Sequence, residues 1–514
     1  MSDYRPDGET LRRFLLDESL VKGIRGPIGS GKSVACCIEV FRRAAAQAPD
    51  ATGWRRSRWA IIRNTNPQLK TTTIKTWLHW FPEDRFGRFN WAPPYTHHIK
   101  VGDPRAGTAI DLEVLFVPLD SAADVRKLLS LDLTGVWINE AREIEKTILD
   151  NVIPRTNRYP GRADGGCTWH GVIMDSNSMD DDHWWPIVSG EAAIPEWMSE
   201  EDALALVRPD NWSFYTQPPA MLERRDQTGR IGYVMNPMAE NLNNLPVNYY
   251  HDAISGKTKQ WIDMYVMNRL GLDITGRPVY SNFNLDFHVA KHPIPFRPDL
   301  GVLVGCDFGL TPAGVILQRM PNGSYHVLKE VVTTDTGARR FARAMKTAIM
   351  ARCPNAKSVQ STGDPAGDQR SSTDETTVFQ ILRDEGFPVI PAYSNDPAIR
   401  IETVDSVLGR AIDGAPGLLV DPSCKVLIKG FAGGYTYARM AGDMNQHEPR
   451  PDKRNRYSHI HDALQYALLG AGEGRRALRT KEAQVVNVRV DRPSPLERRG
   501  WSERNARIKW DRQT

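Results

Sequence analysis

The sequence predicts an α/β protein with two domains, and three observations support this. The chain has 514 residues, more than one hydrophobic core usually supports. Its front half alternates short apolar runs with helical stretches, which is typical of a parallel sheet covered on both faces. Behind the proline-rich segment "KHPIPFRPD" (291–299), three consecutive strands are followed by helix–strand units.

The composition excludes several classes of protein. No apolar run approaches the ~18 residues of a membrane span, and the polar start "MSDYRPDGET" does not resemble a signal peptide. The six cysteines show no C-x-x-C spacing, so we expect neither disulfides nor a zinc site. A reducing cytoplasm fits this pattern.

Four apolar runs in the front half are expected to be strands of a mainly parallel sheet. They are "RWAIIRNT" (58–65), "LEVLFVPL" (112–119), "GVWINEA" (135–141) and "HGVIMDS" (170–176).

A glycine-rich stretch near the start, "GPIGSGKS" (26–33), fits the phosphate-loop pattern G-x-x-x-x-G-K-[ST]. The helix expected from "VACCIEVFRR" would direct its positive end toward the phosphates. Lys32 would reach the β- and γ-phosphates of ATP, and the Ser33 hydroxyl would bind Mg²⁺. The residues expected to bind ATP are Gly26, Gly29, Ser30, Gly31, Lys32 and Ser33.

An acidic residue follows the apolar run "LTGVWINEA". Glu140 would orient and deprotonate the attacking water, while its neighbour would steady the magnesium shell and so belong to the ATP site. That neighbour is Asn139, whose amide can accept a hydrogen bond but carries no charge. Metal affinity would then depend more on the nucleotide.

Polar residues also follow the next strand, in "IMDSNSMDDDHWW". Ser176 and Asn177 could touch the γ-phosphate or the attacking water and couple hydrolysis to motion, although Ser-Asn is also ordinary turn chemistry. Asp180, Asp181 and Asp182 fit a solvated acidic turn better than a metal site. A ring-forming ATPase of this class needs an arginine for transition-state charge, and the candidates are Arg63, Arg126, Arg155 and Arg158.

The second half begins with "GVLVGCDFG" and "AGVILQRM", the turn "PNG" (321–323) and "SYHVLKEVV". A helix at about 337–352 and a strand ending at "STGDP" come next. Three antiparallel strands followed by helix–strand alternation is the order of a ribonuclease-H-like domain.

Three aspartates lie where this strand order would bring them together. Asp307 ends the first strand, Asp364 ends a later strand, and Asp462 lies near the start of the helix "YSHIHDALQYALLG". Oxygen ligands of this kind suit two Mg²⁺ or Mn²⁺ ions acting on a phosphodiester. Glu330, Asp368 and His461 are possible additions, but surface or helix-start roles fit each of them better.

The C-terminal segment, 475–514, is basic, with twelve Lys and Arg against five Asp and Glu. The whole chain has a net charge of only +4. Such a tail is often simply solvated, yet it suits phosphate groups or an acidic partner.

Across roughly residues 10–475 the chain resembles the large terminase subunit of tailed bacteriophages. The resemblance is carried by "GPIGSGKS", "GVWINEARE", "IMDSNS", "NPMAENLNNLPVNYY", "GCDFGLTPA", "GDPAG" and "SHIHDALQYAL", in this order. It implies an N-terminal phosphate-loop ATPase domain (1–230), a subdomain or linker (231–298), a ribonuclease-H-like nuclease domain (299–474) and the basic tail (475–514).

The resemblance also implies a function: an ATPase that pumps double-stranded DNA into a procapsid, joined to an endonuclease that cuts the concatemer. The implied partners are a small terminase subunit, the portal protein and further copies of the chain in a ring, a pentamer by family resemblance. The implied place is the host cytoplasm, transiently at the portal vertex, and not the mature virion.

The chain departs from this family at two positions. Many relatives have an arginine inside the phosphate loop where this chain has Ile28, and Asn139 replaces the more usual aspartate. Two other interpretations stay open: a repair or recombination helicase–nuclease, and a structural capsid-vertex component with a relic nucleotide site. Strand displacement would favour the first, and metal-dependent nicking would exclude the second.

Overall fold

The computed structural model divides into two compact units, Met1–Thr275 and Gly276–Thr514, which are described separately below. The structure describes residues 4–119, 125–126, 128–195, 198, 200–225, 231–271, 277–308, 311–334, 336–368, 377–439, 447–453 and 456–474. The basic tail expected at 475–514 lies outside the described residues.

Unit 1 is organised around an eight-stranded sheet in the order β3-β4-β5-β2-β6-β7-β1-β8. The six strands from β5 to β8 are parallel, and β3 and β4 add an antiparallel edge. The strands are β1 (Val21–Arg25), β2 (Trp54–Arg63), β3 (Phe89–Asn90), β4 (Tyr95–Val101), β5 (Ala109–Pro118), β6 (Gly135–Asn139), β7 (Gly171–Ser176) and β8 (Trp212–Thr216).

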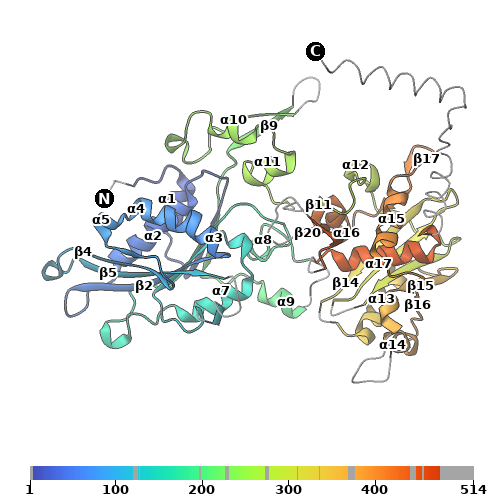
Figure 1. The fold of residues 1–514 in the computed structure, drawn as a ribbon, viewed down its shortest axis with the longest axis horizontal. Helices are drawn as coiled ribbons and strands as arrows, with labels where there is room; N and C mark the ends of the chain where they lie inside the picture. Colours follow the sequence, from blue (N-terminus) through green and yellow to red (C-terminus); the bar gives the residue numbers. More distant parts are fainter. Residues whose placement is uncertain are drawn as a thin grey trace, which may run out of the picture. The chain divides into compact units, whose positions relative to one another are not determined.

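Helices cover both faces of this sheet because alternate residues of each strand are apolar on opposite faces. Trp137 of β6 packs into one core with α1 (Glu9–Leu16), α2 (Lys32–Ala46) and α4 (Ile74–Trp80). Its neighbours on the strand, Val136 and Ile138, face a second core that includes α7 (Lys146–Val152) and α8 (Trp184–Ser189). Figure 1 shows α1, α2 and α4 on one side of these strands and α7 on the other.

A third, smaller core is centred on segments that follow β8 in the chain. Ala220, Met221, Tyr250, Ile262 and Val266 form its centre. It is built by the hairpin of β9 (Met221–Arg225) and β10 (Ile231–Met235) with α10 (Tyr249–Ile254) and α11 (Lys259–Tyr265). Further α-helices in the described part of unit 1 are α3 (Asn66–Gln68), α5 (Glu83–Phe86) and α9 (Glu200–Ala205).

Unit 2 contains a six-stranded mixed sheet in the order β16-β15-β12-β13-β14-β19. The first three strands along the chain are antiparallel, and β15 then pairs in parallel with β12. The strands are β12 (Val302–Asp307), β13 (Ala313–Arg319), β14 (Tyr325–Val332), β15 (Val359–Gly363), β16 (Ile390–Pro391) and β19 (Leu418–Val420).

The two faces of this sheet are covered by different helices. Val304 and Cys306 of β12 pack into a core with α13 (Ala338–Arg352) and α14 (Val378–Asp384). Gly305, between them, faces α17 (Ser458–Gly470). The other elements are β11 (Arg277–Pro278), α12 (Leu285–His288), α15 (Pro397–Leu408), β17 (Ala411–Ile412), β18 (Ala415–Pro416), α16 (Lys425–Lys429), β20 (Thr436–Arg439) and β21 (His447–Pro451).

The predicted fold class is confirmed: both units are α/β, the first sheet is mainly parallel, and the second has the predicted ribonuclease-H strand order. All six cysteines are free; five are buried and Cys167 is half-buried. Among the described residues, no helix combines the length and apolar character that crossing a bilayer requires.

Candidate active sites

The phosphate loop joins β1 to α2. Gly29 and Gly31 have φ angles of 71° and 82°, a region that glycine enters without the steric cost of a Cβ atom. This turn lets α2 begin at Lys32, directly behind the loop. The unpaired N–H groups of a helix N-terminus favour an anion there.

Two side chains from distant parts of unit 1 hold the loop. Gln217, directly after β8, accepts a hydrogen bond from Ser30 Oγ (2.6 Å) and donates to the Ser30 carbonyl (3.0 Å). Asn241 Nδ2 donates to the Gly29 carbonyl (2.7 Å). The backbone of the loop is therefore fixed by groups outside α2 and β1, as a preorganised phosphate site requires.

Ile28, where many of the resembled proteins have arginine, has a structural role. Its side chain packs against the third core of unit 1, which includes Tyr250 and Ile262. The Tyr250 hydroxyl donates to the Ile28 carbonyl (2.7 Å), and the Ile28 N–H donates to the Tyr265 carbonyl (2.9 Å). Ile28 thus anchors the loop to α10 and α11.

Lys32 lies across the loop in a buried position. Its Nζ donates to the carbonyls of Gly26 (3.0 Å) and Pro27 (2.6 Å) and to Asn177 Oδ1 (3.2 Å). Burial lowers the pKa of Lys32, and the negative charge of Glu140 opposes that shift. Only the Asn177 amide therefore separates the Lys32 ammonium from Glu140, the residue expected to act as base.

Glu140 follows β6 in a left-handed conformation with φ 55° and ψ 60°. Its carboxylate accepts hydrogen bonds from Asn177 Nδ2 (3.0 Å) and the Asn177 N–H (3.3 Å). Burial raises the pKa of Glu140, the charge of Asp175 adds to this, and Lys32 opposes it. A carboxylate with a raised pKa is a better proton acceptor near neutral pH than an ordinary one.

The groups expected around magnesium also lie together. Ser33 Oγ donates to Asp175 Oδ2 (2.5 Å), and Asn139 Nδ2 donates to both oxygens of the same carboxylate (3.0 and 3.1 Å). The Asn139 oxygen accepts from Thr73 Oγ1 (2.7 Å). A hydroxyl with a carboxylate behind it fits Mg²⁺, which prefers oxygen ligands and keeps part of its water shell.

Ser176 supports the loop rather than pointing into it. Its carbonyl accepts from the Gly26 N–H (3.1 Å), and its hydroxyl accepts from the Arg142 N–H (3.2 Å). Arg142 Nε lies 3.6 Å from Glu140 Oε2, and its guanidinium donates to the Tyr265 hydroxyl (2.8 Å). Arg142 was not among the predicted arginines, although it lies in the quoted stretch "GVWINEARE".

The four predicted arginines differ in position. Arg63 is buried and directs its guanidinium to the Asn139 carbonyl (3.4 Å) within its own unit. Arg155 is half-buried, whereas Arg126 and Arg158 are exposed. An arginine that reaches into a neighbouring subunit must be exposed, so the geometry favours the last two over Arg63.

In unit 2, Asp307 and Asp462 lie on the face of the sheet that α17 covers. Asp307 Oδ2 accepts from His459 Nδ1 (2.7 Å), and Asp462 pairs with Arg400 (3.2 Å) and with Lys453. Both aspartates are buried. The pKa of Asp307 is raised to about 6, mainly by burial. The hydrogen bond with His459 opposes this shift, and the charge of Asp462 adds to it.

Asp364 follows β15 and is fixed by its neighbours. Its Oδ1 accepts from the Ala366 N–H (2.9 Å) and from Asn395 Nδ2 (3.1 Å). Asn395 Oδ1 in turn accepts from the Tyr466 hydroxyl (2.7 Å). Tyr466 lies one helical turn after Asp462. Burial is the main cause that raises the pKa of Tyr466; the positive charge of Arg400 opposes this shift, and the charges of all three aspartates add to it.

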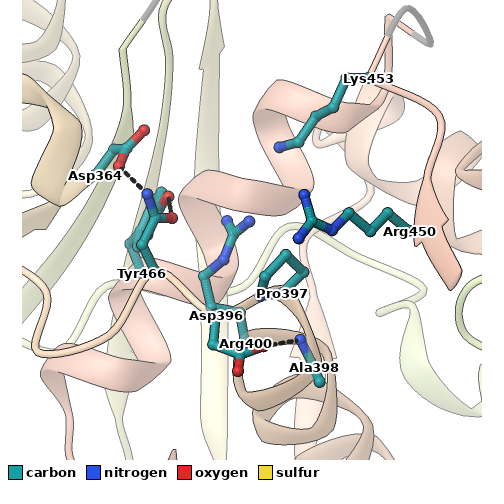
Figure 2. Close-up of a pocket in the computed structure, with 9 residues that line it drawn as sticks. Asp364, Asp396, Pro397, Ala398, Arg400, Arg450, Lys453 and Tyr466 are labelled. Carbon is teal, nitrogen blue, oxygen red and sulfur yellow. Dashed lines mark hydrogen bonds between the residues drawn. The ribbon is translucent and has the colours of Figure 1, made fainter.

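A pocket of about 810 Å³ is lined by Asp364 and by Arg400 and Lys453, the two partners of Asp462. Figure 2 shows Arg400, Arg450 and Lys453 directing their cationic groups into the same space, opposite Asp364. Cations and carboxylates around one pocket suit a phosphodiester, whose charge the cations offset while the carboxylates hold metal ions.

The donor set of unit 2 fits hard cations because it consists of carboxylate oxygens. Among the described residues, the group of three acidic or metal-binding side chains whose ligand atoms all lie within 4.8 Å is Asp180, Asp181 and Asp182. The ligand atoms of Asp307, Asp364 and Asp462 do not form such a group. The Asp180–Asp182 turn in unit 1 is partly exposed, and such clusters are common without an ion.

Two of the possible additions lie outside this site. Glu330 accepts from the Val426 and Leu427 N–H groups (2.9 and 2.8 Å) and so caps α16. His461 is buried and stacks on Tyr435, with ring centroids 4.8 Å apart. Burial lowers the pKa of His461 to about 3, so the ring is neutral.

Several residues at the two sites were not predicted. His459 had a usable signal, because it precedes Asp462 by three residues on a helix and therefore shares its face. Asp175 also had one, since it precedes Ser176 at the end of a strand. No sequence pattern pointed to Gln217 or Arg400, because each is far in the chain from the residue that it contacts.

Neither a protein-family model nor a curated protein matches the sequence. Among solved structures, the chain is similar to the large terminase of a thermophilic bacteriophage, with 14% identity, 90% of this chain and 98% of that chain covered, and a TM-score of 0.37. It is also similar to the HK97 bacteriophage large terminase (10% identity, 90% and 94% covered, TM-score 0.32).

The large terminase nuclease from thermophilic phage G20c aligns with 38% of this chain and 98% of its own, at 15% identity and a TM-score of 0.27. The two solved structures described above as similar over 90% of this chain are both large terminases of bacteriophages.

Proposed function

We propose that the chain is the large subunit of a viral genome-packaging motor. Unit 1 hydrolyses ATP to move double-stranded DNA into a procapsid, and unit 2 cuts the concatemeric DNA at initiation and termination. The observation that carries this proposal is the presence of two sites of different chemistry on two compact units of one chain. A capsid-vertex component would need neither set of buried carboxylates.

In unit 1, Lys32 offsets negative charge on the β- and γ-phosphates, and Ser33 holds the magnesium ion, which draws charge from the same oxygens. Glu140 takes a proton from the attacking water. Asn177 aligns Glu140 through two hydrogen bonds and also contacts Lys32. Loss of the γ-phosphate would change the contacts of Lys32 and reach Glu140 through Asn177.

In unit 2, Asp307, Asp364 and Asp462 would hold two Mg²⁺ or Mn²⁺ ions, which activate water and stabilise the leaving oxygen. Arg400, Arg450 and Lys453 contribute positive charge at the pocket for the DNA backbone. None of these groups reads base edges, so cutting with little sequence preference follows.

The partners belong to the proposal as well. Packaging requires double-stranded DNA, a portal protein on the procapsid, a small terminase subunit that selects the DNA, and further copies of this chain in a ring, for which we propose a pentamer. The place of action is then the host cytoplasm at the portal vertex.

The test is a double dissociation on the full chain. Lys32→Ala should abolish ATP hydrolysis and leave metal-dependent plasmid nicking intact, whereas Asp307→Asn should do the reverse. Lys75→Ala and Asp384→Asn remove exposed charges of the same types and serve as matched controls. An unmodified chain that shows neither activity, or nicking that survives chelator, would contradict the proposal.

A repair helicase–nuclease is the alternative from another class. It separates strands, whereas a packaging motor moves duplex DNA intact. ATP-dependent displacement of a labelled strand by the unmodified chain would favour this alternative.

A further inference from the structure

Asp175, near the end of β7, occupies a position that the proposed function leaves without a role. The strands β6 and β7 are parallel, and Asn139 is paired directly with Asp175. Asp175 is fully buried. Its carboxylate accepts from Ser33 Oγ (2.5 Å), from Trp137 Nε1 (2.7 Å) and from Asn139 Nδ2 (3.0 and 3.1 Å).

The surroundings of Asp175 suit a carboxylate. Ser33, Trp137 and Asn139 all donate hydrogen bonds to its two oxygens. Its negative charge acts on both catalytic groups of unit 1: it helps to raise the pKa of Glu140 and opposes the lowering of the pKa of Lys32 by burial. A fixed negative charge therefore lies behind the Ser33 hydroxyl.

Asn139 already has side-chain partners at both ends of its amide. Its oxygen accepts from Thr73 Oγ1 (2.7 Å), while its nitrogen donates to both oxygens of Asp175. Both the oxygen and the nitrogen of the Asn139 amide therefore make hydrogen bonds, and the amide fixes the position of the Asp175 carboxylate.

We propose that Asp175 supplies the negative charge for the magnesium ion of the nucleotide, in place of Asn139. The inference rests on the proposed function of unit 1. Ser33 would be the direct ligand of the ion: its hydroxyl proton is donated to Asp175, which leaves the oxygen lone pairs for the ion and would make that oxygen a stronger ligand. Compared with the resembled family, which usually has an aspartate at position 139, the acid lies on the adjacent strand, at the residue paired with Asn139.

The experiment measures equilibrium binding of a fluorescent ADP analogue to the full chain, in Mg²⁺ and in EDTA. The ratio of the two affinities isolates the contribution of the metal without any catalytic step. Asp175→Asn should lower this ratio by about tenfold or more, the usual effect of losing an outer-shell partner of a metal. Binding in EDTA should be unchanged or tighter, because a negative charge near the phosphates is lost.

The reciprocal exchange separates a metal role from a packing role. Asn139→Asp alone would place two carboxylates about 3 Å apart, and it should weaken Mg²⁺-dependent binding. Asn139→Asp combined with Asp175→Asn restores one acid and one amide on the same two strands, and it should recover most of the metal effect. Asp150→Asn, on the exposed surface of α7, is the matched control.

The outcomes are distinguishable. If the unmodified chain bound nucleotide more tightly in Mg²⁺ and Asp175→Asn kept the full effect, the inference would fail and the proposed function would stand. If Asn139→Asp alone lowered the magnesium requirement, the inference would also fail. An unmodified chain that bound no nucleotide would overturn the proposed function itself. Should Asp175→Asn unfold, recovery in the double variant decides the matter.

Discussion

Asn177 is the side chain on which the two catalytic groups of unit 1 meet. Its oxygen accepts from Lys32 and its nitrogen donates to Glu140, so the amide is held at both ends. In the proposed function Lys32 would contact phosphate and Glu140 would contact the attacking water, so a change at either would reach the other through the Asn177 amide. No charge has to move for this coupling.

Glu140→Gln should bind ATP but hydrolyse it at least ~10²-fold more slowly, the effect expected for a lost general base. The amide keeps the shape of the side chain but cannot accept the proton. Hydrolysis and fluorescent-nucleotide binding should be measured on the same preparation. Glu145→Gln, an exposed residue at the start of α7, should leave both unchanged. A hydrolysis rate close to that of the unmodified chain would exclude Glu140 as the base.

At this scale, the sequence predicted the residues whose role is set by local backbone geometry. The phosphate loop is one, because Gly29, Gly31 and Lys32 act through a turn and the helix that follows it. It did not predict the side chains that hold the loop, since Gln217 and Tyr250 contact it across 187 and 222 residues of chain. Such contacts exist only once the sheet order is known.

Between elements, the packing of α17 on β12 is close enough to require glycine. A Cβ atom on Gly305 would lie 1.9 Å from the Ala463 carbonyl and 2.7 Å from the Ala467 Cβ. The helix backbone fills the space that a side chain at this position would need. Asp307 on the strand and Asp462 on the helix are thereby held in a fixed relation.

Gly305→Ala should push α17 away from the sheet and abolish nicking while ATP hydrolysis persists. Overpacking of this kind costs about 1–3 kcal/mol, so the melting temperature of unit 2 should fall as well. Gly337→Ala, where nothing lies within 4 Å of the added atom, is the control. Full nicking by Gly305→Ala would show that the site tolerates movement of α17.

In unit 1, a buried ion pair fixes α2 to β1. Lys22 Nζ donates to Glu39 Oε1 (2.6 Å) and to the carbonyls of Phe14 and Asp17 (2.8 Å each), and both charged side chains are fully buried. Glu39 also accepts from Arg43 Nε (2.6 Å). The start of the phosphate loop depends on this anchor, because it follows β1 directly.

Glu39→Ala should destabilise unit 1 by about 3–5 kcal/mol, because it leaves the Lys22 charge buried without its partner. Glu18→Ala removes an exposed partner of Arg43 and should cost no more than about 1 kcal/mol. Urea unfolding of the two variants and the unmodified chain measures the difference. Equal midpoints for the two variants would show that Lys22 finds compensation elsewhere.

Central strands and long helices were predictable because their apolar patterns are strong. The run at 112–119 lies within β5 except for its last residue, and the helix expected at about 337–352 is α13 (Ala338–Arg352). Four strands of the first sheet were not predicted: β1, β3, β4 and β8. β1 lies inside the sheet, but two of its five residues are Lys22 and Arg25, so its apolar pattern is weak. The other three lie at or next to the edges of the sheet. Edge positions are half-exposed, so their sequences mix polar and apolar residues and resemble loops.

For the whole molecule, the main feature is that one chain forms two compact units, each with its own core and its own cluster of buried polar side chains. Strand order alone indicated the class of both units. Sequence patterns did not predict how many subunits form a ring, nor which arginine acts between them. Both depend on contacts between copies of the chain, which no pattern within one chain describes.

Removal of residues 475–514 should weaken DNA binding and flatten its salt dependence. The segment carries twelve Lys and Arg against five Asp and Glu, and each phosphate contact contributes to the slope of log affinity against log salt. The measurement is a salt titration of binding to duplex DNA. A tail with the same composition in scrambled order should restore the slope. Identical slopes with and without the segment would rule out an electrostatic contact.

The six free cysteines have a practical consequence for spectroscopy. Five are buried, and the thiol of Cys167, which burial holds at a pKa of about 11, donates to the Tyr159 carbonyl. Thiol reagents attack the thiolate, so the natural protein should take up dye slowly at neutral pH. One exposed cysteine placed in each unit, at Lys75 and Asp384, would then carry a fluorophore pair. Energy transfer between them would report in real time how ATP or DNA changes the distance between the motor and the nuclease.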